Sequence, residues 1–175
     1  MTFKFDQSKE DIINYYLFIS WYDPDKKNLR IGTYIYLPLF LLLYILVFYN
    51  DIPFFNINTF ILLGIGVLLS PLTVQLFKWI RMYKVKRHLI QGKNMNLIGT
   101  QELTFNNDGI LKTSEFAKSE VKYNSLEKIR EDSLYIYIYV GVESAFLLPK
   151  RVFFNEEEQN QVLDLIKKKT GLKLI

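Results

Sequence analysis

Two long stretches without a charged side chain dominate the hydrophobic pattern of this chain. Residues 31–50 hold twenty such positions and residues 52–77 hold twenty-six more, with Asp51 as the only formal charge between them. A helix rises about 1.5 Å per residue, so twenty residues reach about 30 Å, the thickness of a bilayer's hydrocarbon core. The pattern therefore predicts a hairpin of two membrane-spanning helices, over residues 31–50 and about 59–77.

A pair of buried helices in a soluble protein is the alternative, but such helices seldom run this far without a charged face. Lys26, Lys27 and Arg30 precede the first span, basic residues follow the second, and the connecting loop has no Lys or Arg. The positive-inside rule then places both termini in the cytoplasm. The abundance of Phe, Tyr, Ile, Asn and Lys is typical of a bacterial genome rich in A and T, so we expect a multi-pass protein of the bacterial cytoplasmic membrane.

Polar and apolar residues alternate in the segments outside the hairpin. Residues 2–5 alternate like a short strand, and Ser8 with Asp11 three positions later predicts the start of an amphipathic helix that runs to about residue 22. From Thr100 the period becomes two, which predicts a β-hairpin around residues 107–109 and further strands at 119–123, 125–131, 134–140 and 144–149. Asn155 followed by three glutamates predicts the start of a last helix, which Gly171 ends.

These elements predict four parts of the chain and one fold class. Residues 1–30 form an N-terminal strand and amphipathic helix, 31–77 the transmembrane hairpin, 78–99 a basic juxtamembrane helix and linker, and 100–175 a cytoplasmic sheet domain. The fold class is a membrane helical hairpin plus an α+β domain, with an antiparallel sheet capped by a C-terminal helix.

One predicted strand, residues 134–140, places its tyrosines on one face and its aliphatic residues on the other. If the tyrosine face is open, Tyr135, Tyr137 and Tyr139 form an amphipathic platform suited to a protein partner. If the N-terminal or juxtamembrane helix covers it, the tyrosines belong to the core. Lys150 and Arg151, close by in the sequence, either contact phosphates and acidic partners or pair with nearby glutamates.

The net charge of +4 is carried largely by basic residues just after the second span. Near an anionic membrane surface each such charge contributes about 1 kcal/mol of attraction. We therefore expect contact with anionic lipid headgroups, or else only a topology signal, and no nucleic-acid partner. The residues concerned are Lys78, Arg81, Lys84, Lys86 and Arg87.

Two segments carry a resemblance to a known family. Residues 121–131 read VKYNSLEKIRE, with apolar and aromatic residues at regular spacing, and residues 147–153 read LLPKRVF, a proline followed by two basic residues and a phenylalanine. Both resemble segments of the YcxB-like family of small bacterial membrane proteins, although Tyr123 stands where that family usually has tryptophan. The resemblance implies two spans and a sheet domain like a pleckstrin-homology (PH) domain, with no established catalytic residues.

The side chains that would support catalysis are scarce. The chain has no cysteine, so it has no thiolate zinc site and no cysteine nucleophile, and its single histidine, His88, lies in the basic helix. We therefore expect no enzyme, no cofactor and no metal. The leading prediction is a non-catalytic membrane protein whose sheet domain binds a protein partner or lipid headgroups.

Two further possibilities stay open. The alternative function is an immunity or resistance protein that neutralises a toxin or antimicrobial at the membrane, which a toxin gene directly upstream would favour. Gly66 and Ser70, four apart in the second span, permit close helix packing. We expect them to pack the hairpin, with a homo-oligomer contact as the other use.

Overall fold

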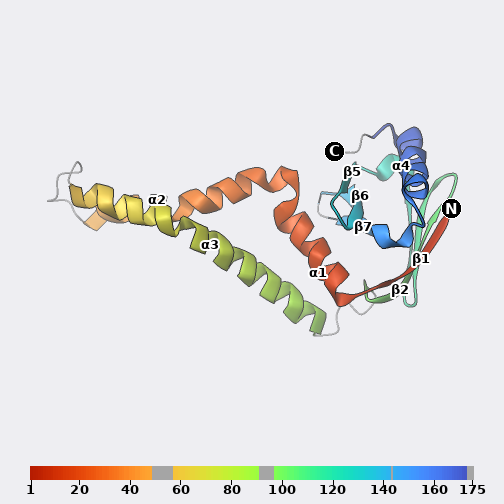
Figure 1. The fold of residues 1–175 in the computed structure, drawn as a ribbon, viewed down its shortest axis with the longest axis horizontal. Helices are drawn as coiled ribbons and strands as arrows, with labels where there is room; N and C mark the ends of the chain where they lie inside the picture. Colours follow the sequence, from red (N-terminus) through yellow and green to blue (C-terminus); the bar gives the residue numbers. More distant parts are fainter. Residues whose placement is uncertain (49–56, 91–96, 143, 173–175) are drawn as a thin grey trace. The chain divides into compact units, whose positions relative to one another are not determined.

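A computed structural model describes residues 1–48, 57–90, 97–142 and 144–172 of the chain. It divides into two compact units, which Figure 1 shows in the colours of the sequence: an α+β domain, from residues 1–19 and 88–175, and a helical hairpin, from residues 20–87. Most of the predicted connecting loop, with Asp51, and the predicted helix end at Gly92 lie outside the described residues, as does the side chain of His88.

The helical hairpin consists of two long helices, α2 (Lys27–Phe48) and α3 (Ile57–Ile90), each with an internal proline. A π-helical turn (Phe18–Tyr22) and a short 3-10 helix (Pro24–Lys26) lead into α2. Both long helices contain a segment apolar enough to cross a membrane, of which only 6% and 17% is buried. Core helices of a soluble protein would be mostly buried, so the two helices expose the apolar surface that a bilayer would cover.

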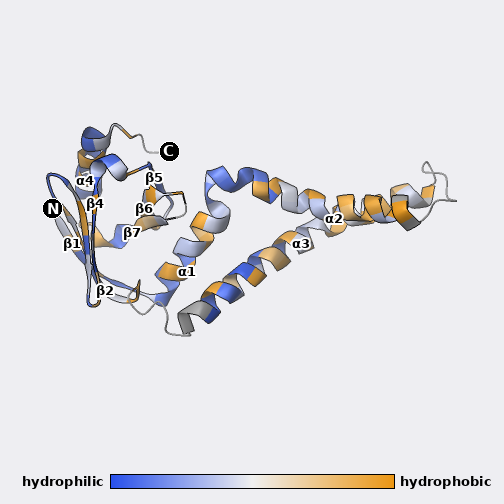
Figure 2. Cartoon of the chain, turned by 180° about the vertical axis from the view of Figure 1, so that it is seen from behind, coloured by the Kyte–Doolittle hydropathy of each residue, from blue (hydrophilic) through white to orange (hydrophobic). Residues whose placement is uncertain are grey.

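Figure 2 shows the same pattern: α2 and α3 are hydrophobic toward their connection, while the C-terminal part of α3 mixes in hydrophilic residues. Helix α3 runs without a break from its apolar segment into the predicted basic stretch, as its helical pattern predicts.

Gly66 packs within the hairpin. A Cβ atom on Gly66 would lie 2.7 Å from Leu41 Cδ1 and 3.3 Å from Pro38 Cα, both on α2. Ser70 is also buried, and its hydroxyl donates to the Val67 carbonyl at 2.8 Å. This close approach is the hairpin packing that we expected from the two small residues.

In its described residues, the α+β domain contains seven antiparallel strands in two sheets and two α-helices, α1 (Lys9–Leu17) and α4 (Glu156–Thr170), which confirms the predicted fold class. Two short 3-10 helices, Tyr123–Ser125 and Lys150–Val152, lie between its strands and before α4. The four-stranded sheet has the order β1-β2-β3-β4 and the three-stranded sheet the order β5-β6-β7. The strands are β1 (Thr2–Gln7), β2 (Gly99–Phe105), β3 (Gly109–Ser114), β4 (Lys118–Lys122), β5 (Lys128–Glu131), β6 (Tyr135–Gly141) and β7 (Ser144–Pro149).

The N-terminal strand belongs to this domain, which corrects the predicted boundaries. β1 pairs with β2 along its whole length, from Thr2 opposite Thr104 to Gln7 opposite Gly99. Residues 1–30 are therefore not a separate part, and the domain does not begin at residue 100. In chain order, the hairpin is inserted into the domain between its first two strands.

Both α-helices of the domain begin where the capping residues predict, and α4 also ends there. Helix α1 ends at Leu17, and the π-helical turn continues it to the predicted end at about residue 22. In α1 (Lys9–Leu17), Ser8 and Asp11 form a capping box, with hydrogen bonds of 3.1 and 2.8 Å. In α4 (Glu156–Thr170), Asn155 Oδ1 accepts from the Glu158 backbone at 2.9 Å, and Gly171 ends the helix at φ 72°. The buried face of α4 packs on the core between the sheets, with Val162, Leu163 and Ile166.

Candidate functional site

The predicted tyrosine platform is covered. Tyr137 and Tyr139 are fully buried and Tyr135 is 4% exposed. Together with Leu147 they pack against Phe18 and Ile19, which follow α1. The Phe18 ring stacks on that of Tyr137, with ring centres 3.9 Å apart and an interplanar angle of 3°. The N-terminal helix thus makes this face a second core, which corrects the prediction of an open partner surface.

Two of the tyrosine hydroxyls donate to carboxylates. Tyr135 donates to Asp11 Oδ1 and Tyr137 to Asp132 Oδ2, each at 2.7 Å. Burial raises the pKa of Tyr137, and its hydrogen bond to the Asp132 carboxylate raises it further. Over the Tyr139 ring lies the Lys128 ammonium, 4.2 Å from the ring centre. These contacts fix the three tyrosines as structural side chains, and the hydroxyls of Tyr135 and Tyr137 are hydrogen-bonded.

Both basic residues of the predicted partner surface are ion-paired. Lys150 Nζ lies 2.9 Å from Glu131 Oε2, and Arg151 binds both oxygens of Asp11. Burial alone would raise the pKa of Asp11, but hydrogen bonds from Arg151, Tyr135 and the Ser8 backbone lower it to about 2. Sequence reasoning gave Asp11 only a capping role, because nothing in the spacing relates it to a residue 140 positions away.

One comparison with known proteins finds a match in the C-terminal part of the chain. Residues 105–166 match the family model described as YcxB-like protein. The match confirms the resemblance over the part of the chain that runs from the end of β2 into α4. No curated protein and no solved structure matches the chain.

The YcxB-like region contains both segments that carried the resemblance, and each has a packing role. Tyr123 is buried in the core, and its hydroxyl donates to the Asn106 carbonyl at 3.0 Å. Phe153 packs edge-on against Phe3 of β1, with ring centres 5.1 Å apart. With the ion pairs of Lys150 and Arg151, the proline-basic-basic segment connects β1, α1 and β5.

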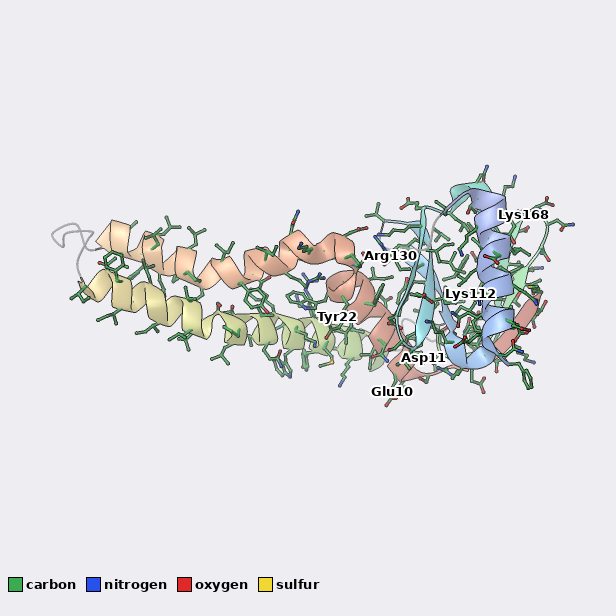
Figure 3. All side chains as sticks on the ribbon, turned by 45° about the horizontal axis from the view of Figure 1, so that its top comes forward. Glu10, Asp11, Tyr22, Lys112, Arg130 and Lys168 are labelled. Atoms are coloured by element: carbon green, nitrogen blue, oxygen red, sulfur yellow. The ribbon has the colours of Figure 1, made fainter. Side chains whose placement is uncertain are left out.

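The basic residues of α3 fall into two groups within the helical hairpin. Lys78 donates to the Tyr22 hydroxyl, and Arg81 donates to the Ser20 carbonyl at 2.7 Å while its guanidinium lies over the Trp21 ring. Lys84, Lys86 and Arg87 are exposed. Figure 3 labels Tyr22 beside α3. The first group holds the π-helical turn to α3, and the second group is free to meet solvent or lipid.

A groove of about 380 Å³ opens between α2 and α3 at this level. Its polar side chains come from both helices, and aromatic rings line the rest of its wall. Arg81 is the basic residue in that wall, and its fork of donors can bind a phosphate or carboxylate bidentately. The lining residues are Trp21, Asn28, Leu29, Gly32, Thr33, Tyr36, Phe77 and Arg81.

Metal ligands are not gathered anywhere in the part of the chain that the structure describes. No three His, Cys, Asp or Glu side chains there lie close enough to hold a metal ion. The two carboxylates at the tyrosine face, Asp11 and Asp132, each accept several hydrogen bonds. Neither is placed as a free general acid or base.

Proposed function

We propose that this protein is a non-catalytic integral protein of the bacterial cytoplasmic membrane that binds anionic lipid headgroups at the inner leaflet. Its two spans would anchor the α+β domain in the cytoplasm, with both termini on that side. The groove between α2 and α3 would take the headgroup beside Arg81, and Lys84, Lys86 and Arg87 would attract further anionic lipid.

The observation that supports this proposal best is the continuity of α3. The helix passes directly from an apolar segment into three exposed cations, Lys84, Lys86 and Arg87. A continuous helix keeps these charges within one to two turns of Arg81, so all four lie within about 9 Å of one another along the helix axis. Each exposed cation near an anionic surface would contribute about 1 kcal/mol of attraction.

The proposal is tested with the full-length protein in nanodiscs of phosphatidylglycerol and phosphatidylcholine in equal amounts. After detergent extraction, native mass spectrometry counts the lipids that stay bound. We expect phosphatidylglycerol to be enriched on the wild-type protein. The enrichment should fall in a Lys84→Gln/Lys86→Gln/Arg87→Gln variant and fall further when Arg81→Gln is added.

The matched control is a Lys4→Gln/Lys118→Gln/Lys122→Gln variant, which removes three exposed charges from the α+β domain. It should keep the enrichment. Equal retention of the two lipids by the wild-type protein would contradict the proposal and leave the basic stretch as a topology signal alone. The protein-partner and immunity alternatives stay predictions from sequence.

A further inference from the structure

The inward-facing side chains of the four-stranded sheet become polar at one end. In β1 the buried row is Phe3, Phe5 and Gln7. In β3, Lys112 lies directly opposite the buried Leu103 of β2, so both side chains point to the inner face. Across the next pairing Ser119 of β4 lies opposite Lys112. An apolar core thus gives way to polar residues at the end of the sheet that α1 approaches.

A cavity of about 350 Å³ lies at this polar end. Its walls come from α1, β1, β3, β4 and β7, all of them elements of the α+β domain. Ile12, Leu97, Phe146 and Leu147 make much of the wall apolar. Its polar side chains are Gln7, Lys112, the serines at 114, 119 and 144, and the tyrosines at 15 and 16. Pockets that bind small molecules share this build, with few polar groups on an apolar wall.

Neither Gln7 Oε1 nor the Lys112 ammonium has a hydrogen-bond or ion-pair partner among the described residues. Gln7 is 5% exposed, and its Oε1 accepts no hydrogen bond. Lys112, which Figure 3 labels, is half-buried and forms no ion pair or hydrogen bond with any described residue. Burial also lowers the pKa of the Lys112 ammonium. A buried acceptor and a half-buried cation that no described residue pairs with are both unfavourable in a fold, so their presence in one cavity favours a ligand.

We infer that this cavity binds a small monocarboxylate that carries a hydroxyl or amine donor beside an apolar group. The carboxylate would pair with Lys112, the donor would bond Gln7 Oε1, and the apolar group would lie against Ile12, Phe146 and Leu147. This site is separate from the lipid-binding surface proposed above, and neither depends on the other.

Charge and size decide the class of ligand. Lys112 is the cation among the lining residues, and a single cation balances one negative charge, whereas a phosphate group with two charges would call for a second cation. At about 30 Å³ for each water-sized group, the cavity has room for on the order of ten non-hydrogen atoms. A hydroxy acid or amino acid with one aromatic or branched side chain has about this number of atoms. Its hydroxyl or amine lies next to the carboxylate, and its side chain is apolar.

The test measures binding of three probes to the full-length protein in nanodiscs by isothermal titration calorimetry: 3-phenyllactate, 3-phenylpropionate and inorganic phosphate. We expect 3-phenyllactate to bind most tightly and phosphate not to compete with it. Lys112→Met should weaken 3-phenyllactate by about tenfold or more, because a hydrogen-bonded charge pair is lost. Lys118→Met removes an exposed lysine of the same sheet and should change nothing.

The Gln7→Leu variant tests whether the hydroxyl of the ligand donates to Gln7 Oε1. It should weaken 3-phenyllactate by about fivefold and leave 3-phenylpropionate, which has no hydroxyl, unchanged. Should Lys112→Met fail to fold, Ser119→Trp serves instead, because this exposed edge position lets the ring fill the cavity while the core stays intact. Unchanged binding in Lys112→Met or in a folded Ser119→Trp variant overturns the inference, as does phosphate competition or no saturable binding of 3-phenyllactate.

Discussion

Arg151 binds Asp11 through both of its terminal nitrogens, with Nη1 to Oδ1 at 2.8 Å and Nη2 to Oδ2 at 2.6 Å. Asp11 is almost fully buried, while the Arg151 side chain is about half exposed. The pair joins the N-terminal helix to the segment before α4, on the two sides of the inserted hairpin in the chain. Arg151, which the sequence suggested as a partner-binding residue, therefore holds two segments of the domain together.

Asp11→Asn should lower the free energy of unfolding by about 2 kcal/mol at pH 7, because the pKa of Asp11 falls from 3.8 to about 2 on folding. A carboxyl with a depressed pKa stabilises the fold above its ordinary pKa, and this stability is lost as the pH falls through the folded value. The difference between variant and wild type should therefore shrink between pH 3.8 and about 2. Denaturant unfolding at several pH values measures it, with the exposed Glu120→Gln as the control.

Tyr137→Ser should destabilise the domain by about 3–5 kcal/mol, because it removes a fully buried ring and its stacking on Phe18. Tyr137→Phe keeps the ring and loses one hydrogen bond to Asp132, so it should cost about 1 kcal/mol. Phe116→Ser, at a ring that is 61% exposed in the same domain, should have little effect. Wild-type stability in Tyr137→Ser would mean that α1 does not cover this face.

Gly66→Ile should lower the melting temperature of the full-length protein in detergent, because the new side chain would meet Leu41 and the backbone of Pro38. Gly64→Ile is a matched control, since nothing lies within 4 Å of a Cβ atom at that position. Both variants add the same side chain to the same helix. If Gly64→Ile is the more damaging of the two, Gly66 is not at the hairpin contact.

The topology can be tested directly, because the chain has no cysteine of its own. In intact cells, a membrane-impermeant maleimide should label Asp51→Cys, in the predicted outer loop, and should label Lys118→Cys only after lysis. The expectation follows from the basic residues that flank both spans and are missing between them. Labelling of Lys118→Cys in intact cells would reverse the orientation.

Local patterns predicted most of the secondary structure. The uncharged stretches correspond to α2 and α3, the capping residues mark the starts of α1 and α4, and the change to period two marks the strands of the domain. Each of these signals acts between neighbours in sequence, through hydrogen bonds of a cap or the alternation of a pleated strand. The candidate site was harder to predict, because the sequence alone allowed the tyrosines to be either exposed to a partner or buried under a helix.

The sequence by itself determined that two helices are long and apolar enough to span a membrane, that basic residues flank them, and that an α+β domain follows. Only the tertiary structure decided that β1 completes the sheet, that α1 buries the tyrosines, and that Lys112 faces a cavity. The physical reason is distance along the chain. Strand pairing, burial and ion pairing join residues about a hundred or more positions apart, such as Thr2 with Thr104 and Asp11 with Arg151, and no local pattern records which partners meet.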